Sequence, residues 1–236
     1  MQTKIIQDGG EPFKVLVHES GEQNSPVILF SVGAGGMPER YSTLLDTLKK
    51  SGCTIIAPYF EMLTNHFPNK IELSLRARRL SLSLKACTQP NSKVIGIGHS
   101  IGAATLIALA GAEMQTRSRE IVDILPDNRL VSLVILAAPT KFFYAPGSLD
   151  TVNIPIFAWV GSEDEITPSA QTEWLAQTIP NPQMVEMRVI EGGDHFSFMD
   201  QVPPHIAEPQ IDKNKFLQEY SEEISKFALS QKYVLD

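Results

Sequence analysis

The chain has 236 residues, of which 43% are hydrophobic and 20% are charged, proportions typical of a globular protein with a sizeable core. Its net charge of −7, with basic residues clustered only at 76–79, argues against nucleic acid or an anionic membrane surface as a partner. The N-terminus lacks a long apolar stretch and no run approaches about 18 apolar residues, so we expect neither signal peptide nor membrane span. Cys53 and Cys87 are expected to be buried and reduced, which favours a cytoplasmic protein.

Eight short apolar segments, most of them bounded by glycine, proline or polar residues, predict β-strands. In chain order they are 3–7, 12–19, 26–32, 53–57, 93–98, 130–137, 154–160 and 185–190. Apolar residues at helical spacing predict helices between and after them, at 38–50, 71–87, 100–114, 169–178 and 213–232.

The first two strands form a hairpin at Asp8-Gly9-Gly10, and strands then alternate with helices. This order predicts one α/β domain over residues 1–236, with a mainly parallel central sheet of about eight strands flanked by helices. Only about sixteen residues separate the strands at 130–137 and 154–160, so we expect no large cap domain.

In the helix predicted at 71–87, the apolar side chains recur at helical spacing, while Arg76, Arg79 and Ser83 fall on the other side. We therefore expect these arginines to lie on a solvent-exposed helix face and not in a binding patch.

The segment 94–105 carries the most informative motif. Gly98-His99-Ser100-Ile101-Gly102 follows a buried strand and opens a helix of small residues. This arrangement is typical of a nucleophilic serine on a sharp strand-to-helix turn, where a β-carbon at Gly98 or Gly102 would strike the neighbouring strand or helix. A turn with a merely structural serine would give the same pattern, so the rest of the chain must decide.

Two later strands end in polar loops at the same edge of the predicted sheet, because the carboxyl ends of parallel strands meet there. The loop at 161–168 holds three carboxylates, and the loop at 191–198 holds His195. A serine hydroxyl needs a base to act as a nucleophile, and a carboxylate orients that base. We predict that Ser100 is the nucleophile, that His195 is the base, and that the acid is one of the three carboxylates Glu163, Asp164 and Glu165.

Alternatives exist for each assignment. Glu163 and Glu165 could also be solvated surface charges, and Asp194 is expected to be a turn residue. His99 adjoins the serine and is expected to pack, whereas the remaining histidines lie in no motif; these are His18, His66 and His205. No spacing typical of a metal site occurs, and the glycine-rich run at 33–36 lacks the lysine of a nucleotide loop, so we expect no metal and no cofactor.

The motif at 98–102, followed by Gly161-x-x-Asp164-x-x-x-Pro168 and by Gly193-Asp194-His195, resembles the α/β-hydrolase family. Within that family the chain is similar to the compact, lidless dienelactone-hydrolase-like branch, over roughly residues 12–230. The resemblance implies that Asp164, which matches the motif, is the acid, with Glu163 as the second candidate. It also implies an oxyanion hole formed by the backbone N–H groups of Ala34 and Ile101.

The chain departs from the family at two places. Dienelactone hydrolases use a cysteine nucleophile, where this sequence has Ser100. The loop after the third strand usually begins with His-Gly in the family, but here it begins with Val32-Gly33.

These residues predict a serine hydrolase that cleaves a small carboxylic ester through an acyl-enzyme; thioester, lactone and amide substrates use the same machinery and stay open. A non-catalytic α/β-hydrolase scaffold that binds a ligand or protein is the alternative. The expected partner is a small-molecule ester, and the sequence leaves the oligomeric state open. Methionine and aromatic residues at the same edge are candidate pocket residues, although any one of them could instead pack a loop; they are Met37, Tyr41, Phe60, Met62, Phe142, Phe143, Tyr144 and Phe196.

Overall fold

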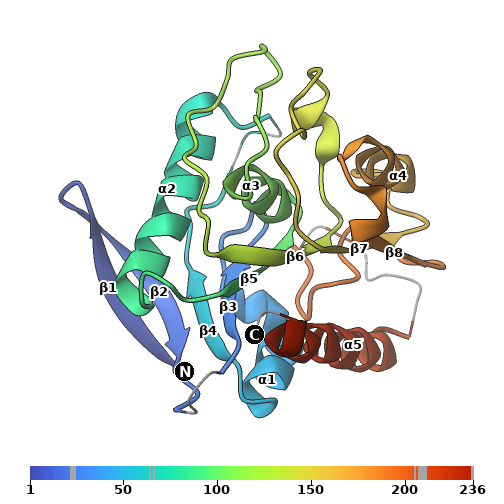
Figure 1. The fold of residues 1–236 in the computed structure, drawn as a ribbon. Helices are drawn as coiled ribbons and strands as arrows, with labels where there is room; N and C mark the ends of the chain where they lie inside the picture. Colours follow the sequence, from blue (N-terminus) through green and yellow to red (C-terminus); the bar gives the residue numbers. More distant parts are fainter. Residues whose placement is uncertain (22–24, 64, 66, 205, 207–211, 235–236) are drawn as a thin grey trace.

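The computed structural model describes residues 1–21, 25–63, 65, 67–204, 206 and 212–234, and shows one sheet with helices on both faces (Figure 1). The strands are β1 (Gln2–Asp8), β2 (Glu11–His18), β3 (Val27–Ser31), β4 (Thr54–Pro58), β5 (Val94–His99), β6 (Leu130–Leu136), β7 (Ile156–Gly161) and β8 (Val185–Ile190). The α-helices are α1 (Ser42–Lys50), α2 (Lys70–Cys87), α3 (Ile101–Leu109), α4 (Ser169–Thr178) and α5 (Lys213–Val234). Short 3-10 helices are η1 (Pro38–Tyr41), η2 (Thr140–Phe143) and η3 (Pro182–Met184). The predicted strands are therefore confirmed within about two residues.

The eight strands lie in the order β1-β2-β4-β3-β5-β6-β7-β8. Only the β1–β2 and β2–β4 pairs are antiparallel, and the other pairs are parallel, as predicted. In β3, β5, β6 and β7 nearly every residue is buried, because helices cover both faces of the central sheet; this explains their continuous apolar sequences. Since β3 and β5 to β8 run in the same direction, the loops that follow them meet at one edge.

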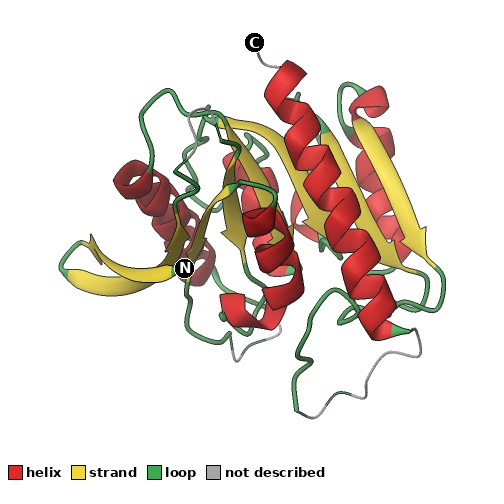
Figure 2. Ribbon diagram, turned by 90° about the horizontal axis from the view of Figure 1, so that it is seen from below, coloured by secondary structure: helices red, strands yellow, loops and turns green. Residues whose placement is uncertain are grey.

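Two hydrophobic layers hold the helices on the sheet. Leu80 of α2, Leu106 of α3 and Leu175 of α4 belong to one cluster, whereas Leu45 of α1 and Ile224 of α5 belong to the other. Figure 1 shows α2, α3 and α4 on one side of the sheet and α1 and α5 on the opposite side, and Figure 2 shows α1 and α5 in front of the strands. In the described part of the chain, the connection between β6 and β7 contains only η2, and no cap domain is present.

Helix α3 ends five residues earlier than predicted, at Leu109 instead of Met114. Gly111 has φ +122°, which a helix cannot contain. Beyond it the backbone bonds to distant loops, with Glu113 N–H donating to Ser148 O and Gln115 N–H to Phe142 O, both at 2.8 Å. These tertiary hydrogen bonds outweigh the helical preference of the small residues that the prediction followed.

The predicted exposure of the arginines of α2 is wrong for Arg76, which is only 2% exposed, and Ser83 on the same side is fully buried. The helix contacts β1, β4 and α3, so neighbours cover part of its polar side as well as its apolar side. Arg79, with its side chain 13% exposed, bonds to the buried carboxylate of Asp8 at the end of the hairpin. Cys53 is buried as expected, but Cys87 is half-buried; both are free thiols.

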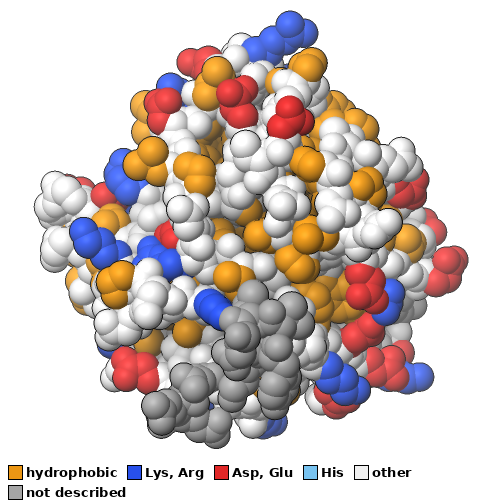
Figure 3. Space-filling view, viewed as in Figure 1, with side chains coloured by type: hydrophobic (Ala, Val, Ile, Leu, Met, Phe, Trp, Pro, Cys, Tyr) orange, Lys and Arg blue, Asp and Glu red, His pale blue; other side chains and the backbone are white. Residues whose placement is uncertain are grey.

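On the face shown in Figure 3, acidic, basic and hydrophobic side chains are mixed together. Within the described residues, no helix has both the length and the apolar character required to cross a bilayer.

Candidate active site

Ser100 occupies the turn between β5 and α3 in a strained conformation, with φ 53° and ψ −129°. The turn requires flanking residues without a β-carbon, because other backbone atoms lie close to Gly98 and Gly102. A β-carbon on Gly102 would lie 2.1 Å from Ser31 O, and one on Gly98 would lie 2.8 Å from Ala103 N. Both positions therefore require glycine, which confirms the reason given for their presence in the sequence. The Ser100 side chain lies at the carboxyl end of β5, partly exposed.

The three residues predicted to act together lie within hydrogen-bonding distance. His195, in the loop after β8, places its Nε2 3.0 Å from Ser100 Oγ. Its Nδ1 lies 2.9 Å from Oδ2 of Asp164, which comes from the loop after β7. Asp164 and His195 are 3% and 5% exposed, so this series of bonds is largely shielded from solvent.

Four donors converge on the Asp164 carboxylate. Oδ1 accepts from the N–H groups of Ile166 at 2.9 Å and Thr167 at 2.7 Å, and Oδ2 accepts from the Thr167 hydroxyl at 2.7 Å and from His195. Burial by itself raises the pKa of Asp164, but the bonds from His195 and Thr167 outweigh it and hold that pKa below its usual value. The carboxylate is thus ionised and can only accept hydrogen bonds, so the proton of neutral His195 lies on Nδ1, which leaves Nε2 free to accept the Ser100 proton.

Thr167 is a site residue that the sequence interpretation missed. Its hydroxyl oxygen lies 3.1 Å from His195 Nδ1 while its hydrogen is directed to Asp164, so it helps to hold both groups. A signal was present in the sequence, since an aspartate followed three residues later by a threonine suits a turn in which the carboxylate accepts from the next N–H groups.

The alternative acids do not meet the histidine. Glu163 and Glu165 are exposed, and the Glu163 carboxylate lies near its neighbour Ser162. Asp194 accepts hydrogen bonds from Phe196 N–H and from the Ser197 hydroxyl, which makes it the turn residue that was predicted.

His99 packs behind the site, and a chain of hydrogen bonds runs through it. Gly33 N–H donates to the Tyr41 hydroxyl at 3.3 Å, and that hydroxyl lies 2.9 Å from His99 Nδ1. His99 Nε2 lies 2.8 Å from the carbonyl oxygen of His195, which can only accept, so His99 carries its proton on Nε2 and accepts from Tyr41. Burial, aided by the nearby His195, lowers the pKa of His99 to about 3 and keeps its ring neutral.

The other histidines have no place in this arrangement. His18 is in β2, which β4 and β3 separate from β5. His66 and His205 lie outside the described residues.

The two expected oxyanion donors follow β3 and β5. Ile101 is the first residue of α3, so no preceding helical carbonyl can accept from its N–H. Ala34 lies in the loop after β3, where its carbonyl accepts from Leu63 N–H at 2.9 Å; among the described residues its own N–H has no acceptor. This loop lies next to the serine: a β-carbon placed on Gly33 would be 3.5 Å from Ser100 Cβ.

The candidate pocket residues divide into two groups. Tyr41 and Phe143 are 1% and 0% exposed, so they pack in the core; their assignment to a substrate pocket is corrected, because a residue after a strand can turn inward as easily as outward. Phe196 lies beside His195, with ring centroids 5.2 Å apart, and is half-buried like Phe142. Met37, just beyond the loop after β3, is 47% exposed.

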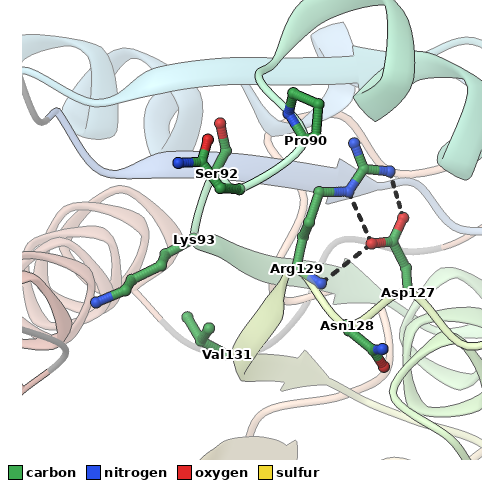
Figure 4. A pocket seen from close by; sticks show the side chains of 8 residues that line it. Pro90, Ser92, Lys93, Asp127, Asn128, Arg129 and Val131 are labelled. Carbon is green, nitrogen blue, oxygen red and sulfur yellow. Dashed lines mark hydrogen bonds and ion pairs between the residues drawn. The ribbon is translucent and has the colours of Figure 1, made fainter.

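A surface hollow of about 420 Å³ lies elsewhere (Figure 4). Lys93 and Arg129, which line it, stand before β5 and β6, at the amino ends of those strands, whereas Ser100 follows the carboxyl end of β5. The Arg129 guanidinium there is bonded to Asp127 at 2.5 and 2.8 Å (Figure 4). Within the described residues, no group of three or more His, Cys, Asp or Glu side chains could hold a metal ion.

No protein-family model and no curated protein sequence matches the chain. Solved structures do match. A CIB-like hydrolase from Thermoplasma acidophilum is 15% identical with a TM-score of 0.67, over 95% of this chain and 98% of that one. A serine hydrolase homologue from Coxiella burnetii is 15% identical with a TM-score of 0.62 (95% and 96% covered), and Est1E from Butyrivibrio proteoclasticus is 12% identical with a TM-score of 0.64 (97% and 99% covered). At these identities the likeness establishes the fold, which is that of the α/β-hydrolases.

Proposed function

We propose that this protein is a serine hydrolase that cleaves small carboxylic esters through an acyl-enzyme intermediate. The observation that carries the proposal is the continuous series of bonds from Ser100 Oγ through His195 to the buried carboxylate of Asp164. A serine hydroxyl is a weak nucleophile by itself, and this arrangement of base and carboxylate is what activates it. The esterases and the serine hydrolase among the matching structures support the same reaction class.

In the proposed reaction, Ser100 Oγ attacks the ester carbonyl carbon while His195 Nε2 takes the hydroxyl proton. Asp164 stabilises the imidazolium, and the N–H groups of Ala34 and Ile101 bind the oxyanion of the tetrahedral intermediate. The intermediate collapses with cleavage of the C–O bond to the alcohol, which receives the proton from His195. Water then attacks the acyl-enzyme through the same base, and the carboxylic acid leaves.

We propose a small substrate because the β6–β7 connection, where a cap domain could lie, contains only η2 and adds little apolar surface beside Ser100. A substrate held in a lipid aggregate would require a larger apolar docking surface. Est1E, one of the matching proteins, has been crystallised with ferulic acid, so an aromatic ester belongs in the substrate panel.

The test is labelling with a fluorophosphonate, which reacts with an activated serine. We expect the wild type and the control Ser230→Ala, which changes an exposed serine of α5, to label, and Ser100→Ala to remain unlabelled. Turnover should then be measured on p-nitrophenyl acetate, butyrate and octanoate, methyl ferulate, a thioester and a lactone. A folded wild type that neither labels nor turns over any of them would refute the proposal and favour the non-catalytic scaffold.

A further inference from the structure

Arg76 reaches from α2 to the loop that follows β3. Its Nη2 donates to the carbonyl oxygens of Val32 at 2.6 Å and Gly33 at 2.8 Å, so one nitrogen holds two consecutive peptides. The guanidinium carbon lies 4.3 Å from the centroid of the Phe60 ring. Burial lowers the pKa of Arg76 to about 10, still well above neutrality, so the side chain is a buried cation.

This arrangement is a poor way to stabilise a fold. Among the described residues, Nε and Nη1 of Arg76 have no hydrogen-bond partner, although both are buried. A buried cation with unsatisfied donors costs free energy, and apolar side chains of similar size commonly replace such groups without loss of stability. The contacts of Arg76 therefore point to a role in the loop that it holds.

The geometry of the peptide bond gives that role. In a trans peptide the C=O and the following N–H point in opposite directions, and the described residues contain no cis peptide. The Val32 carbonyl faces Arg76, and the Gly33 N–H of the same peptide is directed away, to the Tyr41 hydroxyl. The Gly33 carbonyl also faces Arg76, so the Ala34 N–H is likewise directed away from α2. That N–H is the one left without an acceptor.

We propose that Arg76 is a positioning residue for the oxyanion hole, an inference that rests on the proposed hydrolase function. It fixes the orientation of the Gly33–Ala34 peptide so that Ala34 N–H is presented to the reacting carbonyl. Its charge also polarises that peptide, which makes the N–H a stronger donor. The loop lacks the histidine with which it usually begins in α/β-hydrolases, and Arg76 supplies a fixed point from a different element.

The consequence is specific to the transition state. Negative charge appears on the carbonyl oxygen only as the tetrahedral intermediate forms, so a misdirected Ala34 N–H slows acylation while leaving ground-state binding nearly unchanged. Loss of a complete oxyanion donor typically lowers kcat by about 10²–10³. Arg76→Met retains the donor and the bond from Gly36 N–H to Gly33 O at 3.2 Å, so it loosens the orientation of the peptide without removing every constraint on it. We therefore expect kcat to fall roughly 10- to 100-fold with KM within about threefold of wild type.

Three variants test the proposal. Arg76→Met removes both bonds, Arg76→Lys retains a cation that can donate to the same carbonyls, and Arg79→Met is a matched control. Arg79 is on the same helix and lies over an aromatic ring, Phe13, but bonds to Asp8 and not to the loop. The measurements are kcat and KM on p-nitrophenyl acetate, the rate of fluorophosphonate labelling of Ser100, and the thermal midpoint.

We expect Arg76→Met to lose kcat and labelling rate together, Arg76→Lys to recover at least part of both, and Arg79→Met to keep wild-type kcat. A kcat for Arg76→Met within twofold of wild type would overturn the inference, as would an equal loss of kcat in Arg79→Met. If the wild type labels but Arg76→Met has the same kcat and labelling rate as the wild type, the hydrolase proposal stands and the inference on Arg76 is wrong. If the wild type itself does not label, both are wrong.

Discussion

Asp164→Asn is the substitution whose effect the structure determines most fully, because backbone donors dictate how the new amide must lie. The N–H groups of Ile166 and Thr167 both point at Oδ1, so the asparagine oxygen must occupy that position. The NH₂ group then takes the place of Oδ2, facing His195 Nδ1. It can only donate there, which forces the His195 proton onto Nε2.

In that tautomer Nε2–H faces Ser100 Oγ and cannot accept its proton. The variant therefore keeps the geometry of the site but has no base. A wrong tautomer of this kind costs on the order of 10⁴ in kcat, or about 5.5 kcal/mol at about 1.36 kcal/mol per decade. The fold should be unaffected, because the amide is nearly isosteric and retains both backbone bonds.

The assay is kcat on the ester that the wild type turns over fastest, with the thermal midpoint as a check of folding. Glu163→Gln is the matched control, since it removes the neighbouring exposed carboxylate and should leave kcat unchanged. If Asp164→Asn kept more than a tenth of the wild-type kcat, or if Glu163→Gln lost as much, the assignment of the acid would be refuted.

Three further predictions concern the surrounding structure. His99→Gln should reduce the loss of stability on acidification: wild-type His99, with its pKa lowered to about 3, stays neutral when folded but binds a proton when unfolded below about pH 6.5. The contribution of His99 to the free energy of unfolding is thus complete above about pH 6.5, and it decreases by up to about 1.4 kcal/mol per pH unit as the pH falls toward 3. Urea denaturation of both proteins at pH 7 and 5 can measure this, and an equal loss of stability in wild type and variant would contradict it. Gly102→Ala should give little folded protein, because its β-carbon would lie 2.1 Å from Ser31 O; a wild-type thermal midpoint would contradict this. Thr167→Val removes one donor to Asp164, so the pKa of Asp164 should rise toward its usual value. Loss of a hydrogen bond to a charged group costs about 1.5 kcal/mol, so kcat should fall roughly tenfold. The pH-rate profiles of wild type and variant test this, and an unchanged kcat would contradict it.

The sequence alone predicted the order and type of nearly every element, because periodicity, glycine and proline act within a few residues of one another. It also predicted that Ser100, Asp164 and His195 would lie at one edge, since the ends of parallel strands must meet there, and the structure brings them within hydrogen-bonding distance. The motif likewise predicted glycine at 98 and 102, although the atom that a β-carbon at Gly102 would strike, Ser31 O, belongs to the separate strand β3. The catalytic roles of the three residues rest on the proposed labelling and turnover experiments.

Only the tertiary structure decided which polar side chains are buried and what they hold. The pattern of α2 identified its apolar side, but periodicity carries no information on what covers the other side, so Arg76 was predicted to be exposed. Its partners lie 43 and 44 residues away in the chain, and the bond from Tyr41 to His99 spans 58 residues. Such contacts depend on how complete elements pack together, because a hydrogen bond requires two atoms within about 3 Å and no local sequence pattern fixes a distance between separate elements.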